Sequence, residues 1–145
     1  MSNNAKYYRK KYAPECVEQL GNVMQQEMMT ALGLASEIDD SHDLRQLLIK
    51  NGLLESNRKI RALDEMIRER GTTPDQAWED YLKKRVLAEP SQALKRKPLL
   101  ARAKNRYFET ACDETQNETM RELFLFKAKN SETEERIIEE VLGKA

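Results

Sequence analysis

The chain has 145 residues, which is the usual size of one globular domain. It contains only five glycines and four prolines, and this scarcity of turn-forming residues argues against a β-sandwich or barrel. No apolar run approaches the ~18 residues that a membrane span needs, and the first eleven residues lack the apolar stretch of a secretory signal. Two cysteines, Cys16 and Cys112, make no disulfide framework and fit a reducing compartment. We therefore expect a cytoplasmic protein without a membrane segment.

Charge is unevenly distributed along the chain, although the net charge is zero. Residues 58–106 contain 14 Lys and Arg against 7 Asp and Glu, whereas residues 107–145 contain 5 against 10. The middle third is therefore strongly basic and the last third acidic. Such an asymmetry predicts a basic face that the net charge hides.

The first half of the chain predicts a basic arm followed by two helices. Residues 1–12 are polar and basic and are expected to form a flexible arm, with a single helical domain over residues 13–145. Apolar residues at steps of three and four from Val17 to Ile38 predict the first helix, and the polar cluster 39–41 should end it and cap the next. The second helix is expected over residues 43–70, with Gly71 as its C-cap. Its predicted inward face consists of Leu44, Leu48, Ile49, Leu53, Ile60, Leu63 and Ile67.

The second half predicts a short helix and then two longer ones. Thr73 begins a capping-box pattern with Pro74 at the first helical position, so a short helix should cover residues 74–88. A fourth helix is expected from Pro98 to about Asp113, and a last helix from a capping box at residues 115–118 to Leu142. The residues predicted to face inward in the fourth helix are Leu99, Leu100, Ala103, Tyr107, Phe108 and Ala111. No segment alternates with period two, so the fold class is all-α.

These helices suggest a four-helix bundle of two helical hairpins joined by a long crossover that contains the short extra helix. A shift of the chain by 76 residues aligns Arg45 with Arg121 and Leu47 with Leu123, which fits either a duplication or a chance match of amphipathic hairpins. The organisation over residues 14–142 resembles the ferritin-like four-helix-bundle superfamily. In its metal-binding members, two helices each supply a Glu and two each supply Glu-x-x-His.

The sequence departs from that metal-binding pattern. His42 is the only histidine, lies in a predicted turn, and no Glu-x-x-His is present. A complete di-iron site is therefore not expected, and neither is any cofactor. A site made of carboxylates alone for a hard cation stays open as an alternative. The residues that would form it are Glu27, Glu55, Glu109 and Glu135.

Three charged residues interrupt the predicted apolar stripes: Glu27, Arg58 and Glu134. A buried charge is costly unless it is paired, and one guanidinium can meet two carboxylates. The pattern therefore allows a buried ionic cluster in which Arg58 bridges Glu27 and Glu134. The alternative is that one or more of them lie at the stripe edge and reach solvent.

The basic segment and the arm are the candidate partner-binding surface, because clustered cations can neutralise an anionic partner. The candidate residues are Lys83, Lys84, Arg85, Lys95, Arg96, Lys97, Arg102, Lys104 and Arg106, together with Arg9, Lys10 and Lys11 of the arm. Tyr7, Tyr8 and Tyr12 interleave the arm cations and could stack on unpaired bases. An ordinary solvated face, balanced by the acidic last helix, is the alternative interpretation.

No catalytic motif stands out, so we expect a non-enzymatic binding or regulatory bundle that engages an acidic protein or a nucleic acid through its basic face. Two alternatives from other classes remain open at this point. One is a ferritin-like carboxylate metal-binding protein with a degenerate site. The other is a purely structural bundle that self-assembles into a homo-oligomer.

Overall fold

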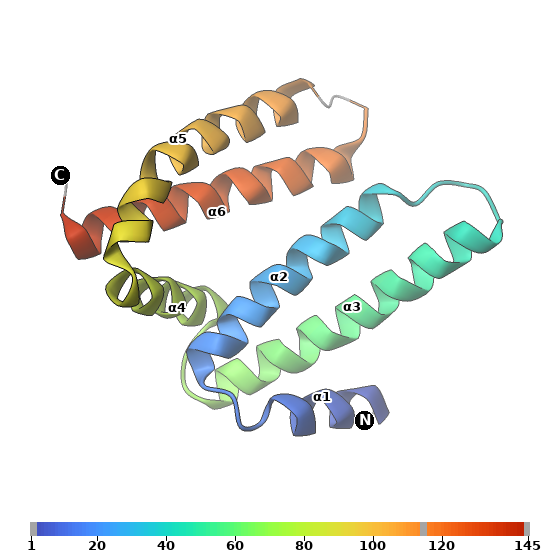
Figure 1. Ribbon diagram of the computed structural model, residues 1–145. Coiled ribbons are helices and arrows are strands. Elements are labelled where there is room, and N and C mark those ends of the chain that lie inside the picture. The colour runs from blue at the N-terminus through green and yellow to red at the C-terminus, as the bar shows by residue number, and fades with distance from the viewer. Residues whose placement is uncertain (1–2, 114–115, 144–145) are drawn as a thin grey trace. The chain divides into compact units, whose positions relative to one another are not determined.

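The computed structural model describes residues 3–113 and 116–143, and this part of the chain contains helices and no strand. The all-α prediction is therefore confirmed. Among the described helices, none is both long and apolar enough to cross a membrane. The six helices (Figure 1) are α1 (Asn3–Tyr12), α2 (Val17–Ser36), α3 (Leu44–Glu69), α4 (Pro74–Ala88), α5 (Pro90–Asp113) and α6 (Glu118–Leu142).

The chain divides into two compact units, Met1–Trp78 and Glu79–Ala145, and the single helical domain over residues 13–145 stays a prediction. The first unit contains the hairpin of α2 and α3, and the second contains the hairpin of α5 and α6. Both predicted hairpins are thus present. Their assembly into one four-helix bundle with a crossover stays a prediction.

The core of the first unit lies between α2, α3 and the start of α4. Leu20, Leu63 and Ile67 are fully buried, and Met24, Met66 and Ala77 complete the cluster. Their spacing of three and four residues is what the helical stripes predicted. Burial of side chains of this size stabilises the fold by roughly 1.5–3 kcal/mol each, so this cluster fixes how α2 packs on α3.

The turn between α2 and α3 is held by Asp43 and Gln46. Asp43 is the N-cap of α3, because its Oδ1 accepts a 2.8 Å hydrogen bond from the Gln46 amide nitrogen. The buried Gln46 side chain then accepts from the Asp39 amide and donates to the Glu37 carbonyl. The cap is therefore Asp43 and not the preceding cluster, whose Asp39 instead accepts two hydrogen bonds from Ser41. These bonds lower the pKa of the Asp39 carboxyl.

Residues 3–12 form a helix packed on α3, where the sequence suggested a flexible arm. Tyr8 is buried and donates a hydrogen bond to Glu55. Arg9 forms ion pairs with Glu65 at 3.0 Å and Glu69 at 2.8 Å. A ten-residue polar helix is too short to be stable alone in water, so these contacts with α3 account for its formation.

Helix ends in the rest of the chain follow the capping signals only in part. Thr73 caps α4 as expected, since its Oγ1 accepts from the Gln76 amide at 3.2 Å. The C-cap of α3 is Arg70 and not the predicted Gly71, which follows it with a positive φ. The N-cap of α6 is Asn117, whose Oδ1 accepts from the Met120 amide. Thr115 of the predicted capping box lies outside the described residues.

The fourth predicted helix starts eight residues earlier than expected. α5 begins at Pro90, and Pro98 lies inside it. Proline suits a first helical position because its missing N–H would have no partner there. Inside a helix it removes one backbone hydrogen bond, so the contacts of α5 with α6 must compensate for Pro98.

Several leucines predicted to face inward are exposed. Leu44 and Leu48 of α3 and Leu99 of α5 lie on the surface, and Phe108 is also exposed. In each helix the apolar residues occupy two faces, and only one of them packs on the neighbouring helix. The sequence pattern did not show which face that would be.

The two glycines inside α2 give a matched pair of tests. A Cβ at Gly21 would lie 2.6 Å from backbone atoms of Ala77 and Trp78, whereas a Cβ at Gly33 would meet nothing within 4 Å. We expect Gly21→Ala to lower the free energy of unfolding by about 1–3 kcal/mol through overpacking. Gly33→Ala should raise it by about 0.5–1 kcal/mol through helix propensity. Urea unfolding followed by circular dichroism measures both, and equal effects of the two variants would contradict the close approach of α2 and α4.

Candidate functional site

The most buried charge of the second unit is Glu134 on α6, which is 6% exposed. Arg96 of α5 reaches its two carboxylate oxygens at 2.9 and 3.2 Å, and Arg85 of α4 also forms an ion pair with it. One carboxylate therefore connects three helices. We call these three residues the Glu134 cluster. Because a lone buried carboxylate would be very costly, both guanidiniums act as structural partners.

Two further ion pairs connect helices of this unit in the same way. Lys97 of α5 lies 3.4 Å from Glu139 of α6. Arg136 of α6 pairs with Glu79 of α4 and, at 2.7 Å, with Glu140 on its own helix. The acidic last helix thus neutralises part of the basic segment, as the solvated-face interpretation expected.

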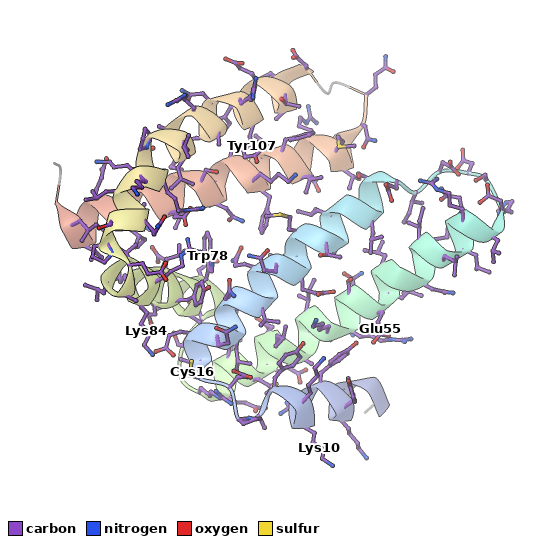
Figure 2. All side chains as sticks on the ribbon, viewed as in Figure 1. Lys10, Cys16, Glu55, Trp78, Lys84 and Tyr107 are labelled. Carbon is purple, nitrogen blue, oxygen red and sulfur yellow. The ribbon has the colours of Figure 1, made fainter. Side chains whose placement is uncertain are left out.

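Three exposed cations of α5 have no carboxylate partner among the described residues: Lys95, Arg102 and Arg106. Their spacing of seven and four residues places them on one face of the helix, and we call them the basic stripe. A surface depression of about 770 Å³ lies beside Arg102 and Arg106, with Leu99 and Tyr107 also in its lining. Tyr107, labelled in Figure 2, packs against Phe124 of α6.

The remaining candidate cations of this segment differ from the basic stripe. Lys83 and Lys104 are half-buried, so their charges are less available to a partner. Lys84 is exposed but already interacts within the chain. Of the nine cations predicted from residues 83–106, the structure therefore assigns Arg85, Arg96 and Lys97 to internal ion pairs and leaves three in a continuous exposed row.

The cations of the predicted arm are mostly engaged with the first unit. Arg9 binds Glu65 and Glu69, which lowers the pKa of the Glu69 carboxyl. Lys11 lies over the rings of Tyr7 and Tyr12 at 5.8 and 5.3 Å. Lys10 is exposed and is labelled in Figure 2 at the surface of α1.

A second polar cluster, the Tyr8 cluster, lies where α1, α2 and α3 meet. Tyr8 donates to Glu55, and Lys59 forms an ion pair with Glu27 at 3.2 Å and lies 5.6 Å from the Tyr12 ring centroid. Burial raises the pKa of Tyr8 to about 12, with added contributions from the hydrogen bond and charge of Glu55 and the charge of Glu27.

This cluster bears on the alternative metal site. Two of the four carboxylates proposed for that metal site, Glu27 and Glu55, belong to the first unit. The ammonium of Lys59 pairs with Glu27, and the hydroxyl of Tyr8 donates to Glu55. Glu109 and Glu135 belong to the second unit, where Glu109 is exposed. Within the described residues, no group of three His, Cys, Asp or Glu side chains is placed to hold a metal ion. Both cysteines are free and exposed.

The buried ionic cluster predicted through Arg58 needs correction. The Arg58 side chain is 51% exposed and lies 3.8 Å from Glu55 of its own helix, so it is not a buried cation. Glu27 instead meets the next residue, Lys59. Glu134 is buried, in agreement with its place on the apolar stripe, but its partners are Arg85 and Arg96.

Sequence reasoning missed the roles of Lys59, Arg96 and Tyr8. Lys59 and Arg58 are adjacent, and one position corresponds to a rotation of about 100° around the helix. The apolar pattern places the inward face only to within about one residue, so it cannot distinguish Lys59 from Arg58. Arg96 was counted among the free cations because its partner lies 38 residues away. A buried tyrosine in a polar segment leaves no periodic signal.

Comparisons with known proteins add no assignment. The chain matches no protein family, and no curated protein or solved structure matches it significantly. The resemblance to the ferritin-like superfamily therefore stays a hypothesis that rests on the helical pattern.

The Glu134 cluster predicts that a nearly isosteric substitution of Glu134 lowers the free energy of unfolding markedly. Glu134→Gln removes the charge that two guanidiniums share, and we expect the free energy of unfolding to fall by about 1.5–3 kcal/mol. Glu132→Gln, on an exposed position of the same helix, is the matched control and should stay within about 0.5 kcal/mol of wild type. Equal urea midpoints for the two variants would show that the buried carboxylate contributes nothing special.

The raised pKa of Tyr8 predicts an alkaline titration step specific to that residue. The folded state favours the neutral phenol, so its contribution to stability is complete below pH ~10, the usual pKa of tyrosine, and is lost as pH rises towards 12. Ultraviolet absorbance of tyrosinate should show one tyrosine that ionises last in the wild type. Tyr8→Phe should remove that step, and Tyr7→Phe, which alters an exposed tyrosine, should leave it in place.

Proposed function

We propose that this protein is a non-catalytic binding module that engages an anionic partner through the basic stripe, Lys95, Arg102 and Arg106. The observation that carries the proposal is the division of cations along α5. Arg96 and Lys97 are bound to carboxylates of α6, whereas the basic stripe faces solvent without a carboxylate partner in the described part of the chain. Glu109 lines the depression beside Arg102 and Arg106 but forms no ion pair with either. Like charges held in one row without an ion pair favour an external anion.

The dimensions of the basic stripe suit an elongated partner. Eleven residues separate its ends, so at 1.5 Å per residue the three cations span about 16 Å. A partner helix that carries carboxylates at steps of seven and four residues would present them with the same spacing. The depression beside Arg102 and Arg106 offers room for side chains at one end of this row.

Of the two anionic classes, an acidic protein surface is the better match. Leu99 is 58% exposed and lies on the same face as the basic stripe, and an apolar side chain between cations suits a protein interface better than a phosphate backbone. Two of the three tyrosines that could stack on bases favour the same choice, because Tyr8 is buried and Tyr12 lies against Lys59 and Lys11. Tyr7 is exposed. A nucleic acid is the second outcome of the test.

The experiment compares two triple charge reversals that change net charge by the same amount. The test variant replaces the basic stripe, Lys95, Arg102 and Arg106, by Glu. The control replaces Arg45, Arg61 and Lys129, which are exposed cations on other helices without an ion pair among the described residues. Fluorescence anisotropy with a labelled oligoglutamate peptide and with labelled oligo-dT then measures binding over a range of salt concentrations.

We expect the test variant to weaken peptide binding at least tenfold while the control loses threefold or less, with unchanged melting temperatures in both. If oligo-dT is instead the tighter ligand, the logarithmic salt slope should fall by about 2 in the test variant, since each contact to a single strand contributes about 0.7. Equal losses in both triples would mean that only net charge matters and would contradict the proposal.

A further inference from the structure

The face of α5 that carries the basic stripe continues into two carboxylates. Glu109 follows Arg106 by three residues and Asp113 follows Glu109 by four, which keeps them on one side of the helix. Both carboxylates are exposed, and neither forms an ion pair among residues 3–113 and 116–143. We call Arg102, Arg106, Glu109 and Asp113 the charged row.

The charged row points away from the helix that packs on α5. The buried residues of α5 are Ala93, Leu100 and Ala111, and at about 100° per residue Ala111 lies on the side opposite Arg102. Because α6 is the helix that packs on α5, the buried side faces α6. Within its own unit the charged row is therefore left exposed.

The charged row is complementary to itself when it is reversed. Arg102 and Arg106 are four residues apart, and so are Glu109 and Asp113, so each like-charged pair spans about 6 Å along the helix. Two cations followed by two anions at the same spacing match an identical row that runs in the opposite direction.

We propose that the anionic partner of the basic stripe is a second copy of this chain, with the two α5 helices antiparallel along their charged rows. The inference rests on the proposed function, since it names the partner of the same surface. In this arrangement Arg106 of one copy lies opposite Glu109 of the other, and Arg102 lies opposite Asp113. A two-fold axis repeats both contacts, so the two rows form four ion pairs in total.

Other pairings of the two rows are less favourable. With Lys95 of one copy opposite Asp113 of the other, Arg102 would lie opposite Arg106, and these like charges repel. With Arg102 opposite Glu109, both Arg106 and Asp113 would face uncharged residues. A symmetric parallel pair would place each charge opposite itself. The proposed register is thus the one that gives every charge of the row an opposite partner.

The overlap of the two helices covers residues 102–113. The depression of about 770 Å³ lies within it, with Arg102, Arg106 and Glu109 in its lining, and offers room for side chains of the other copy. Lys95, the first cation of the basic stripe, lies outside the overlap. Its substitution therefore separates this inference from the proposed function.

The nature of the contacts sets the expected strength. Exposed ion pairs contribute little individually and are screened by salt. We expect a weak dimer, with a dissociation constant of about 10–300 μM at about 20 mM salt that rises at least tenfold at about 500 mM salt. Sedimentation velocity of the full chain over a wide range of concentrations measures both values.

Two charge reversals test the register. The acidic variant carries Arg102→Glu with Arg106→Glu, and the basic variant carries Glu109→Arg with Asp113→Arg. Each variant alone should self-associate at least tenfold more weakly than wild type, because its row then has a single sign. An equimolar mixture should form a heterodimer at least as tight as the wild-type dimer, because all four contacts again join opposite charges.

The matched control is Arg45→Glu with Arg61→Glu, which changes the net charge as the acidic variant does but alters exposed cations of the first unit. It should leave self-association within about twofold of wild type, and circular dichroism checks that every variant is folded. A control that weakens the dimer as much as the acidic variant, or two variants that do not associate when mixed, would overturn the proposal.

Lys95→Glu distinguishes a failure of this inference from a failure of the proposed function. It should weaken binding of the labelled oligoglutamate peptide severalfold and leave self-association within about twofold. A chain that stays monomeric up to about 1 mM at low salt, while the basic stripe still binds the peptide, would overturn the inference and leave the proposed function standing. Equal loss of peptide binding in the stripe variant and its control would overturn the proposed function itself.

Discussion

The buried carboxylate of Glu134 is the constraint on which the second unit depends. A charge that is only 6% exposed cannot remain unpaired at neutral pH without a cost of several kcal/mol. It recruits Arg85 from α4 and Arg96 from α5, so three helices are held to one point of α6. This requirement sets the rotation of α5: once Arg96 and Lys97 face α6, the basic stripe must face away from it. The exposure of Lys95, Arg102 and Arg106 therefore follows from the ion pairs that Arg96 and Lys97 form with α6.

A pocket of about 660 Å³ lies beside the Glu134 cluster, at the junction of α4 and α5. Its lining includes Arg85, Arg96 and the first residues of α5, which would suit a small anion if the arginines were free. They are not free, since both form ion pairs with Glu134. The contrast with the basic stripe shows why the pairing of a cation matters more than its position in a basic segment.

Much of the fold could be predicted from the sequence, because helical periodicity and caps are local signals. The start of α4 at Pro74 followed from such signals, as did the pairing of α2 with α3 and of α5 with α6. The start of α3 lies close to the predicted residue 43, but its cap is Asp43 and not the predicted cluster 39–41. The extent of α5 was missed, because Pro98 suits a first helical position and was taken as the start, whereas the helix begins at Pro90 and contains Pro98. Which apolar face packs inward was missed at Leu44 and Leu99, since a helix with two apolar faces satisfies the same pattern either way.

The candidate site was predictable as a region but not residue by residue. Composition located the basic segment, yet it could not separate Arg96 from Lys95, which are adjacent in sequence and point to different sides of α5. That separation depends on long-range partners such as Glu134, and a single sequence carries no record of them. The same limit explains why Arg58 was chosen where Lys59 is the partner of Glu27.

The most direct test of this account is a double-mutant cycle between Arg96 and Glu134, with Arg102 and Glu134 as the reference cycle. Free energies of unfolding for Arg96→Ala, Glu134→Gln and the double variant give the coupling of the two side chains. The account predicts a coupling of at least 1 kcal/mol for Arg96 with Glu134 and close to zero for Arg102 with Glu134. Equal coupling in the two cycles would contradict the division of α5 into structural and free cations.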